Sequence, residues 1–128
     1  MSSKPIVAIT MGDPAGIGPE VVLKALSHGD VRRTCYPLIL GDWGVLQRVR
    51  SERRGLPKLH HWEPHQPLLP LLRSGDAIVV CALSSLQVKE SQPGAPTKAG
   101  GQAAYRYIHV AAKLVLSQVA DAIATDRR

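Results

Sequence analysis

Short runs of apolar residues alternate along the chain with longer segments in which apolar positions recur at helical spacing. Three runs have the length and composition of buried strands: 6–11 (Ile-Val-Ala-Ile-Thr-Met), 36–40 and 76–83. A fourth candidate strand, 121–125, lies near the C-terminus. Because these runs are mostly apolar and rich in β-branched residues, they are typical of strands buried in a parallel sheet.

The segments between these runs carry the signals of helices. Pro19 occupies the position favoured in a first helical turn, which predicts a helix that begins there and stops at Gly29. Asp42 predicts the N-terminal cap of a second helix that runs to about Arg54. Residues 55–75 are rich in Pro, His and Leu and give no clear element.

The last helix is predicted to be the longest. Thr97 is its expected cap, and it should run to about Val119. Strands that alternate with helices predict an α/β fold with a mainly parallel sheet and flanking helices. The expected apolar face of the long helix consists of Ala104, Ile108, Ala111, Val115 and Val119.

Composition and charge narrow the class of protein. The 128 residues, 45% apolar and 20% charged, are ordinary for one folded domain or part of one. Without a long apolar run or a secretory signal, we expect a cytoplasmic protein with no membrane partner. Cys35 and Cys81 are expected to be buried free thiols. The net charge of +6 is concentrated in Arg48, Arg50, Arg53, Arg54 and Lys58, with Arg127 and Arg128 at the end.

This basic cluster is more typical of a solvated helix face than of a nucleic-acid site, because no aromatic residues are interleaved with the arginines. The histidines do not form an obvious metal site either. His60, His61 and His65 are close in sequence, but they lie in a proline-broken segment without a fourth ligand. His28 is expected at a helix C-terminus and His109 within the long helix.

The segment Met-Gly-Asp-Pro-Ala-Gly-Ile-Gly-Pro-Glu, residues 11–20, carries the clearest chemical signal. It joins a predicted strand to a helix N-terminus, where glycines permit a tight turn and free N–H groups can meet a ligand. It lacks the Lys-Ser/Thr of a P-loop and the spacing of the dinucleotide fingerprint. The segment can therefore be interpreted either as a purely structural turn or as a ligand-binding loop. The candidate cofactor- or substrate-proximal residues are Gly12, Asp13, Gly16 and Gly18.

Asp13 within this segment and two glycines later in the chain can each be interpreted in two ways. For Asp13, hydrogen bonding to loop N–H groups is favoured over facing substrate or cofactor. Gly100 and Gly101, at the start of the long helix, indicate either a nearby ligand or backbone crowding.

As a string, the 11–20 segment resembles the N-terminal signature of the 4-hydroxythreonine-4-phosphate dehydrogenase family of vitamin B6 biosynthesis. Three further segments resemble the family in the same order: 37–42 its second strand and turn, 98–105 its Gly-Gly segment that opens a long helix, and 121–125 its next strand. A glycine-rich string ending in Gly-Ile-Gly-Pro-Glu also occurs in isocitrate and isopropylmalate dehydrogenases. The resemblance thus implies the N-terminal part of an isopropylmalate-dehydrogenase-like fold.

The resemblance also implies a reaction. Family members are homodimers that oxidise and decarboxylate 4-phosphohydroxy-L-threonine on the route to pyridoxal phosphate. NAD accepts the hydride, and a divalent metal (Zn, Mg or Co) held by three histidines polarises the hydroxyl and stabilises the enolate. The family's metal histidines and substrate contacts fall beyond the point where this chain reads Asp126-Arg127-Arg128 and ends. No catalytic or metal-ligating residue therefore maps onto it.

We accordingly expect residues 1–128 to be the N-terminal portion of a larger dehydrogenase, inactive alone, whose C-terminal portion is absent. Two alternatives stay open. The signature and the Ala-Gly-Gly segment are also close to relatives that act on 4-phospho-threonate or erythronate. An alternative of another class is a non-catalytic, truncated remnant.

Overall fold

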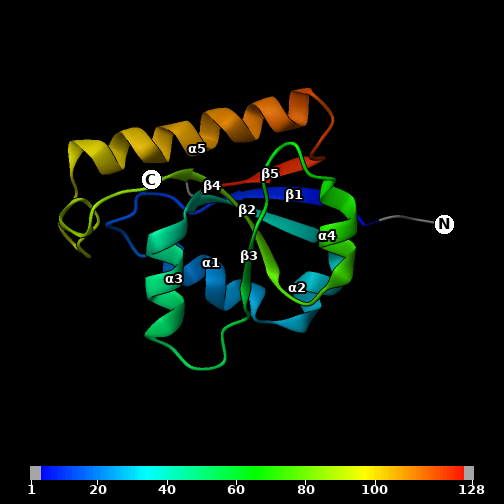
Figure 1. Cartoon of the computed structure of the whole chain (residues 1–128), viewed down its shortest axis with the longest axis horizontal. Helices are drawn as coiled ribbons and strands as arrows, with labels where there is room; N and C mark the ends of the chain where they lie inside the picture. The colour runs from blue at the N-terminus through cyan, green and yellow to red at the C-terminus, as the bar shows by residue number, and fades with distance from the viewer. Residues whose placement is uncertain (1–3, 126–128) are drawn as a thin grey trace.

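Five parallel strands form the centre of the molecule, in the order β3-β4-β2-β1-β5 (Figure 1). The computed structural model describes residues 4–125. The predicted α/β class with a parallel sheet is confirmed. The strands are β1 (Ile6–Thr10), β2 (Tyr36–Asp42), β3 (Leu59–His61), β4 (Ile78–Ser84) and β5 (Ala122–Ala124).

Helices cover both faces of this sheet. The long helix α5 lies along one face, where it contacts β1, β2, β4 and β5, and α1 and α3 pack together on the opposite face (Figure 1). No helix within residues 4–125 is long and apolar enough to cross a membrane. The helices are α1 (Gly18–Leu26), α2 (Gly29–Thr34), α3 (Trp43–Ser51), α4 (Leu68–Ser74) and α5 (Lys98–Leu116), with one 3-10 turn, η1 (Val88–Glu90).

The centre of the core is β2. Leu38, Ile39 and Leu40 are all fully buried, although their side chains alternate between the two faces of the sheet. Helices on both sides explain why this strand carries an uninterrupted apolar run. Each of these side chains contributes roughly 1.5–3 kcal/mol of transfer free energy. The two cysteines are free thiols, as expected: Cys81 is buried and Cys35 half-buried.

Both predicted helix caps are confirmed. The Asp42 carboxylate accepts a hydrogen bond from the Val45 N–H at 3.0 Å, and the Thr97 hydroxyl accepts one from the Gly100 N–H at 3.0 Å. The helices that follow end three residues before the predicted positions, at Ser51 and Leu116.

One predicted helix end is wrong. Gly29 does not stop α1, which ends at Leu26; it is instead the first residue of the short helix α2. His28 consequently occupies the N-cap position of α2 in extended backbone, and not a helix C-terminus. Asp30 in the first turn, with arginines in the last, matches the dipole of this second helix and explains why the chain re-enters helical backbone.

The predicted apolar face of α5 is also rotated. Only Ala111 of the expected set is fully buried, whereas Ile108 is 43% exposed. The helix turns Ala103 and Tyr107 towards the sheet instead. A buried tyrosine with a hydroxyl partner on β4 outweighs the face that aliphatic spacing predicts.

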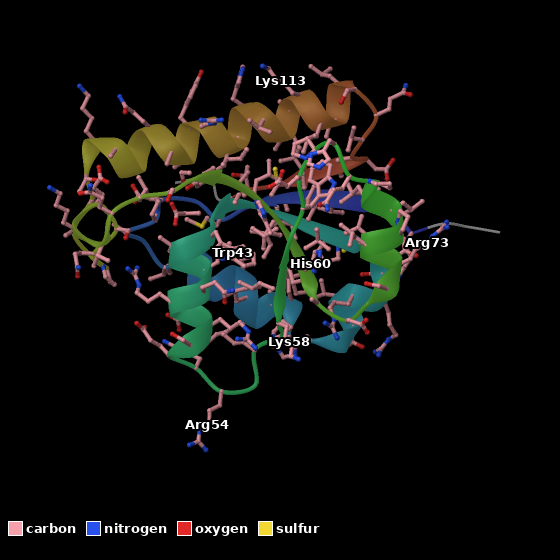
Figure 2. All side chains as sticks on the ribbon, viewed as in Figure 1. Trp43, Arg54, Lys58, His60, Arg73 and Lys113 are labelled. Atoms are coloured by element: carbon pink, nitrogen blue, oxygen red, sulfur yellow. The ribbon has the colours of Figure 1, made fainter. Side chains whose placement is uncertain are left out.

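The basic cluster is only partly a solvated face. Arg48 donates to the Ser91 carbonyl oxygen at 3.0 Å, Arg50 to the Pro57 carbonyl oxygen at 2.9 Å, and Arg53 pairs with Glu20 at 2.6 Å. These three arginines therefore fasten neighbouring segments to α3. Arg54 points away from the molecule (Figure 2). The two C-terminal arginines, Arg127 and Arg128, lie outside the described residues.

Candidate functional site

The segment 11–18, here called the signature loop, leaves the carboxyl end of β1 and enters α1. From β1 the chain continues to β2 on one side, while β5 pairs with β1 on the other. The strand order thus reverses beside β1, and open α/β sheets bind ligands at the carboxyl ends of the strands at such a point.

Hydrogen bonds hold the signature loop in one conformation. The Asp13 carboxylate accepts from the Ala15 N–H at 2.8 Å, and the Asp13 carbonyl accepts from the Gly16 N–H at 2.9 Å. The Gly94 N–H donates to the Ala15 carbonyl at 2.8 Å, which ties the loop to the segment before α5. Gly12 has a φ of +77°, a conformation that favours glycine.

Gly18 has a purely steric reason to be glycine. A Cβ built there would lie 2.2 Å from the Met11 carbonyl oxygen, which is backbone and cannot rotate away. At Gly16 a Cβ would be 3.4 Å from the Asp13 carbonyl oxygen, an ordinary contact in an exposed position. The two glycines therefore have different structural requirements, although both were predicted to have the same role.

The four predicted loop residues line one pocket of about 280 Å³. Thr125, which directly follows β5, closes one side, and its hydroxyl accepts a hydrogen bond from the Thr10 hydroxyl at 2.6 Å. Beside it lies an apolar pocket of about 400 Å³ between β1 and α1 that shares Ile17, Gly18 and Thr125. The signature-loop pocket is lined by Gly12, Asp13, Gly16, Ile17, Gly18, Ala104, Ile108 and Thr125.

Asp13 also faces the start of α5. A Cβ at Gly100 would lie 3.3 Å from Asp13 Oδ1 and 3.3 Å from Thr97 Oγ1, so backbone crowding accounts for this glycine. At Gly101 a Cβ would meet open space. A carboxylate close to a helix N-terminus is favoured by the helix dipole. The recorded hydrogen bond of the Asp13 carboxylate is to the Ala15 N–H of the loop, which is the structural role favoured from the sequence.

Sequence reasoning missed a buried polar network below this pocket. Asp42 is 1% exposed, and its Oδ2 accepts from the Ser84 hydroxyl at 2.9 Å and from the Leu86 N–H at 2.7 Å. The Ser84 and Tyr107 hydroxyl oxygens are 2.5 Å apart. Burial raises the pKa of Tyr107 to about 12, and the nearby Asp42 charge acts in the same direction. The Gly-Asp sequence at the strand end was a usable signal, but we interpreted it only as a cap.

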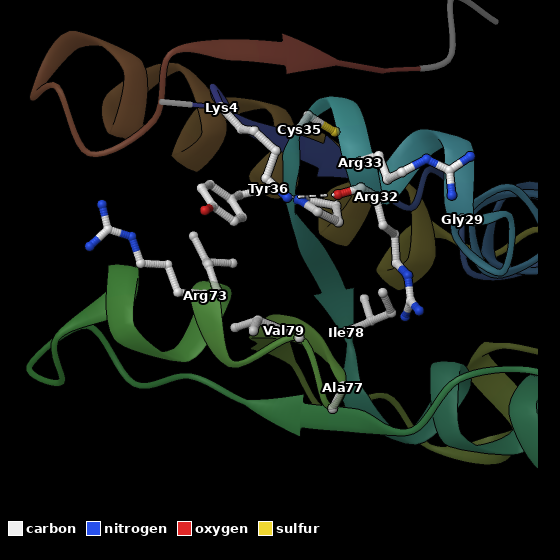
Figure 3. Close-up of a pocket in the computed structure, with 13 residues that line it drawn as sticks. Lys4, Gly29, Arg32, Arg33, Cys35, Tyr36, Arg73, Ala77, Ile78 and Val79 are labelled. Carbon is white, nitrogen blue, oxygen red and sulfur yellow. Dashed lines mark hydrogen bonds between the residues drawn. The ribbon is translucent and has the colours of Figure 1, made fainter. Parts of the chain in front are cut away.

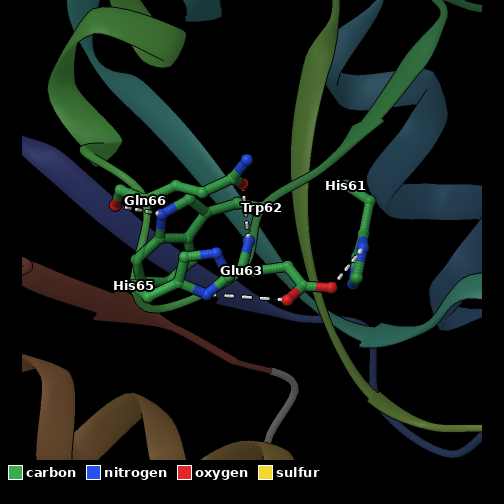
Figure 4. Close-up of polar contacts among 5 residues, drawn as sticks. All are labelled: His61, Trp62, Glu63, His65 and Gln66. Carbon is green, nitrogen blue, oxygen red and sulfur yellow. Dashed lines mark hydrogen bonds and ion pairs between the residues drawn. The ribbon is translucent and has the colours of Figure 1, made fainter.

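In the histidine segment, the exposed side chains of His61 and His65 lie close to Glu63 (Figure 4). The two oxygens of Glu63 lie 3.8 Å from His61 Nδ1 and 3.6 Å from His65 Nδ1. The Trp62 indole N–H donates to the Gln66 carbonyl at 2.9 Å and fixes the turn. Within residues 4–125, no three His, Cys, Asp or Glu side chains are placed to hold a metal ion. The described chain therefore offers no donor set for the divalent metal that the resemblance implies.

Comparison with known proteins finds relatives that are named as dehydrogenases of phosphorylated hydroxy acids. The chain is 39% identical over 122 residues to a 4-hydroxythreonine-4-phosphate dehydrogenase of Trichlorobacter lovleyi, which covers 95% of this chain and 36% of that protein. It is 37% identical over 123 residues to a D-threonate 4-phosphate dehydrogenase of Cupriavidus necator, covering 94% of this chain and 35% of that protein. No family model matches the chain.

Solved structures agree with the sequence relatives. The crystal structure of a 4-hydroxythreonine-4-phosphate dehydrogenase from Burkholderia phymatum matches with a TM-score of 0.80 and 32% identity, over 97% of this chain and 36% of that chain. A second, from Salmonella typhimurium, described as putative, matches with a TM-score of 0.78 and 31% identity, over 97% and 37%. The chain spans about a third of the length of the relatives that it matches.

Proposed function

We propose that this chain forms the cofactor-proximal part of an NAD-dependent dehydrogenase. The proposal is supported by its similarity in sequence and fold to the 4-hydroxythreonine-4-phosphate dehydrogenases over about 36% of their length. The proposed reaction is oxidation and decarboxylation of 4-phosphohydroxy-L-threonine on the route to pyridoxal phosphate, in a homodimer. The observation that carries the proposal is the signature-loop pocket at the reversal of strand order, in a chain whose relatives are named dehydrogenases.

The residues of this pocket fit the uncharged part of a dinucleotide better than a phosphate. The lining includes one carboxylate, Asp13, and no Lys, Arg or His, so a phosphate would meet a like charge. The Asp13 carboxylate can instead accept hydrogen bonds from ribose hydroxyls. Ile17 and Ile108 are 65% and 43% exposed and offer apolar surface to a flat ring. We therefore assign the pocket to a nucleoside portion of NAD.

The residues of this chain would then bind and orient the nucleoside portion of NAD. Asp13 would hold the ribose, while its bond to the Ala15 N–H keeps the carboxylate from rotating. Thr125, whose hydroxyl is hydrogen-bonded to that of Thr10, would form one polar wall of the site. NAD, when bound, would supply the hydride acceptor. We derive no step that involves a metal, because residues 4–125 offer no set of ligands for one.

A second substrate is equally supported. The Cupriavidus necator relative, named a D-threonate 4-phosphate dehydrogenase, is 37% identical to the chain, against 39% for the Trichlorobacter lovleyi relative. This difference of two percentage points does not rank the two substrates. Both are phosphorylated hydroxy acids, so the same class of reaction follows from either.

A chimera tests the proposal. Residues 1–125 of this chain would replace the matching segment of the Trichlorobacter lovleyi relative, and NADH formation would be followed with each substrate and a divalent metal. We expect NAD-dependent turnover of the substrate that the parent enzyme uses. A folded chimera that is inactive with both, while the parent enzyme is active, would contradict the proposal and favour a non-catalytic remnant. The 128-residue chain by itself should form no NADH.

A pair of variants in this chimera tests the pocket assignment. Ala104→Leu adds a side chain into the pocket, whereas Gln102→Leu adds apolar surface at an exposed position of the same helix that does not line it. We expect Ala104→Leu to raise the Kd for NAD about tenfold, equivalent to about 1.4 kcal/mol, and Gln102→Leu to leave it unchanged. Equal Kd values for both variants would show that the cofactor binds elsewhere.

A further inference from the structure

A second cavity, of about 340 Å³, lies at the amino-terminal edge of the sheet (Figure 3). Its walls come from the end of α2, the start of β2, the end of α4 and the start of β4. The signature loop lies at the opposite, carboxyl ends of the strands, and the two pockets share no residue. The amino-edge cavity is therefore separate from the proposed cofactor site.

The charge in this cavity has one sign. Lys4, Arg32, Arg33 and Arg73 line it, and the lining includes no carboxylate. Arg33 forms an ion pair with Asp30 on the same helix. Within residues 4–125, Arg32 and Arg73 have no carboxylate within 4.0 Å. Two guanidinium groups thus flank the cavity without a protein counter-charge.

Lys4 is held in position at the centre of this group. Its ammonium donates to the Arg32 carbonyl oxygen at 3.0 Å and lies 4.3 Å from the centre of the Tyr36 ring. Figure 3 shows Lys4 reaching across Tyr36, with Arg32 on the side of Ile78 and Arg73 on the other side of the ring. A cation–π contact and a backbone hydrogen bond fix the ammonium where an anion can meet it.

The rest of the cavity is apolar. Pro37, Leu72, Ile78 and Val79 form much of its wall, and Arg32 is half-buried against it. Apolar walls reduce the screening of charge, so an anion inside interacts more strongly with the cations than it would on an open surface. Like charges gathered around one cavity also repel each other, and a bound anion removes that repulsion.

We propose that the amino-edge cavity binds the phosphate group of a small phosphorylated molecule. Guanidinium groups present paired N–H donors that match phosphate oxygens, and Lys4 adds a third cation. The volume is in the range of small-molecule sites, and the apolar wall suits a short carbon skeleton attached to the phosphate. The proposal does not depend on the proposed dehydrogenase function.

A titration of the isotope-labelled 128-residue chain with inorganic phosphate tests the site. Ionic strength is held constant with sodium chloride, and amide chemical shifts are recorded. We expect saturable shifts confined to residues 31–37 and 73–79. Arg32→Gln should weaken phosphate binding about tenfold. Arg54→Gln removes the same charge from an exposed position outside the cavity and should change the Kd less than twofold.

Several results would overturn the proposal. One is the absence of saturable shifts in the wild-type chain. Another is equal weakening by Arg32→Gln and Arg54→Gln, which would indicate attraction by net charge alone. A third is a short single-stranded RNA that binds more tightly than phosphate with an affinity that rises with its length, because that pattern belongs to a nucleic-acid surface. Arg73→Gln is a second cavity variant, so the test stands even if Arg32→Gln unfolds the chain.

Discussion

The two ends of the sheet are built from different kinds of interaction. At the carboxyl edge, the signature loop and Asp42 bond to backbone N–H groups at short range, and no Lys or Arg lines the pocket. At the amino edge, four cations surround the cavity, and only Lys4 among them donates a hydrogen bond to another lining residue. One edge is therefore stabilised by hydrogen bonds to the backbone, whereas the other is lined by long charged side chains that make few bonds to the rest of the protein.

Because of this difference, we expect substitutions at the two edges to change different properties of the protein. A substitution at the carboxyl edge changes a glycine or a buried carboxylate that the backbone requires, so its main effect should be on the free energy of unfolding. A substitution at the amino edge removes a charge from a side chain that the backbone does not need. Its main effect should be on anion affinity. Four experiments test this difference between the two edges.

The largest loss of stability is expected for Gly18→Ala. Its Cβ would lie 2.2 Å from the Met11 carbonyl oxygen, so either β1 or α1 must move. We expect the free energy of unfolding in urea to fall by roughly 3 kcal/mol or more. The matched variant Gly16→Ala, at an exposed position, should cost less than about 1 kcal/mol. Similar losses for both would mean that the loop adjusts freely.

The second effect is expected for Asp42→Asn. The new amide must place its NH₂ group either at the Oδ2 position, against the Leu86 N–H and the Ser84 hydroxyl, or at the Oδ1 position, against the Val45 N–H. In either orientation a backbone N–H loses its acceptor. Leaving a buried donor without an acceptor should cost roughly 2–3 kcal/mol. Asp30→Asn breaks an exposed ion pair and should cost less than about 0.5 kcal/mol. Equal unfolding curves for the two variants would argue against the network.

The third effect concerns pH and Tyr107. Burial raises its pKa to about 12 from the ordinary value near 10. The folded state therefore favours the neutral phenol, and this contribution to stability is complete below pH 10 and is lost as the pH rises towards 12. We expect Tyr107→Phe to cost about 1 kcal/mol at neutral pH and to reduce this alkaline loss.

Absorbance titration of the phenolate bands checks the assignment. The titration should contain a late component from Tyr107, and Tyr107→Phe should remove it. If the late component persists in that variant, the high pKa belongs to another tyrosine.

The smallest effect on stability is expected for Arg73→Gln at the amino edge. Arg73 is exposed and has no carboxylate within 4.0 Å among residues 4–125. Its unfolding free energy should stay within about 0.5 kcal/mol of wild type, even where phosphate affinity falls. A loss as large as that of Asp42→Asn would show that the amino edge also depends on its charged side chains for folding.

The sequence predicted what short-range signals encode. Asp42 and Thr97 cap helices by bonding to N–H groups three residues away, so both caps could be identified without a structure. β3 was missed because it has three residues, two of them exposed histidines, and so lacks an apolar pattern. α4 was missed because Pro70 interrupts an otherwise apolar run.

For the candidate site, too, only the residues that are neighbours in the sequence could be predicted. The signature loop is contiguous, so its four residues were found together before the pocket was known. Asp42 meets Ser84 from 42 residues away, and Ser84 meets Tyr107 from 23 residues away. No local pattern connects these three residues. The cations of the amino edge come from three separate segments, and only the fold brings them to one cavity.

The pairing of β1 with β5 has a consequence for how the chain is made. β1 can pair with β2 once about 42 residues exist, but its other edge waits for Ala122–Ala124. At about 5–20 residues per second, the roughly 80 residues between take several seconds to synthesise. Throughout that interval Ile6–Thr10 presents an open strand edge with apolar side chains, which is the form most prone to pair with another chain. The nascent chain is therefore vulnerable to aggregation along β1 until β5 has been synthesised.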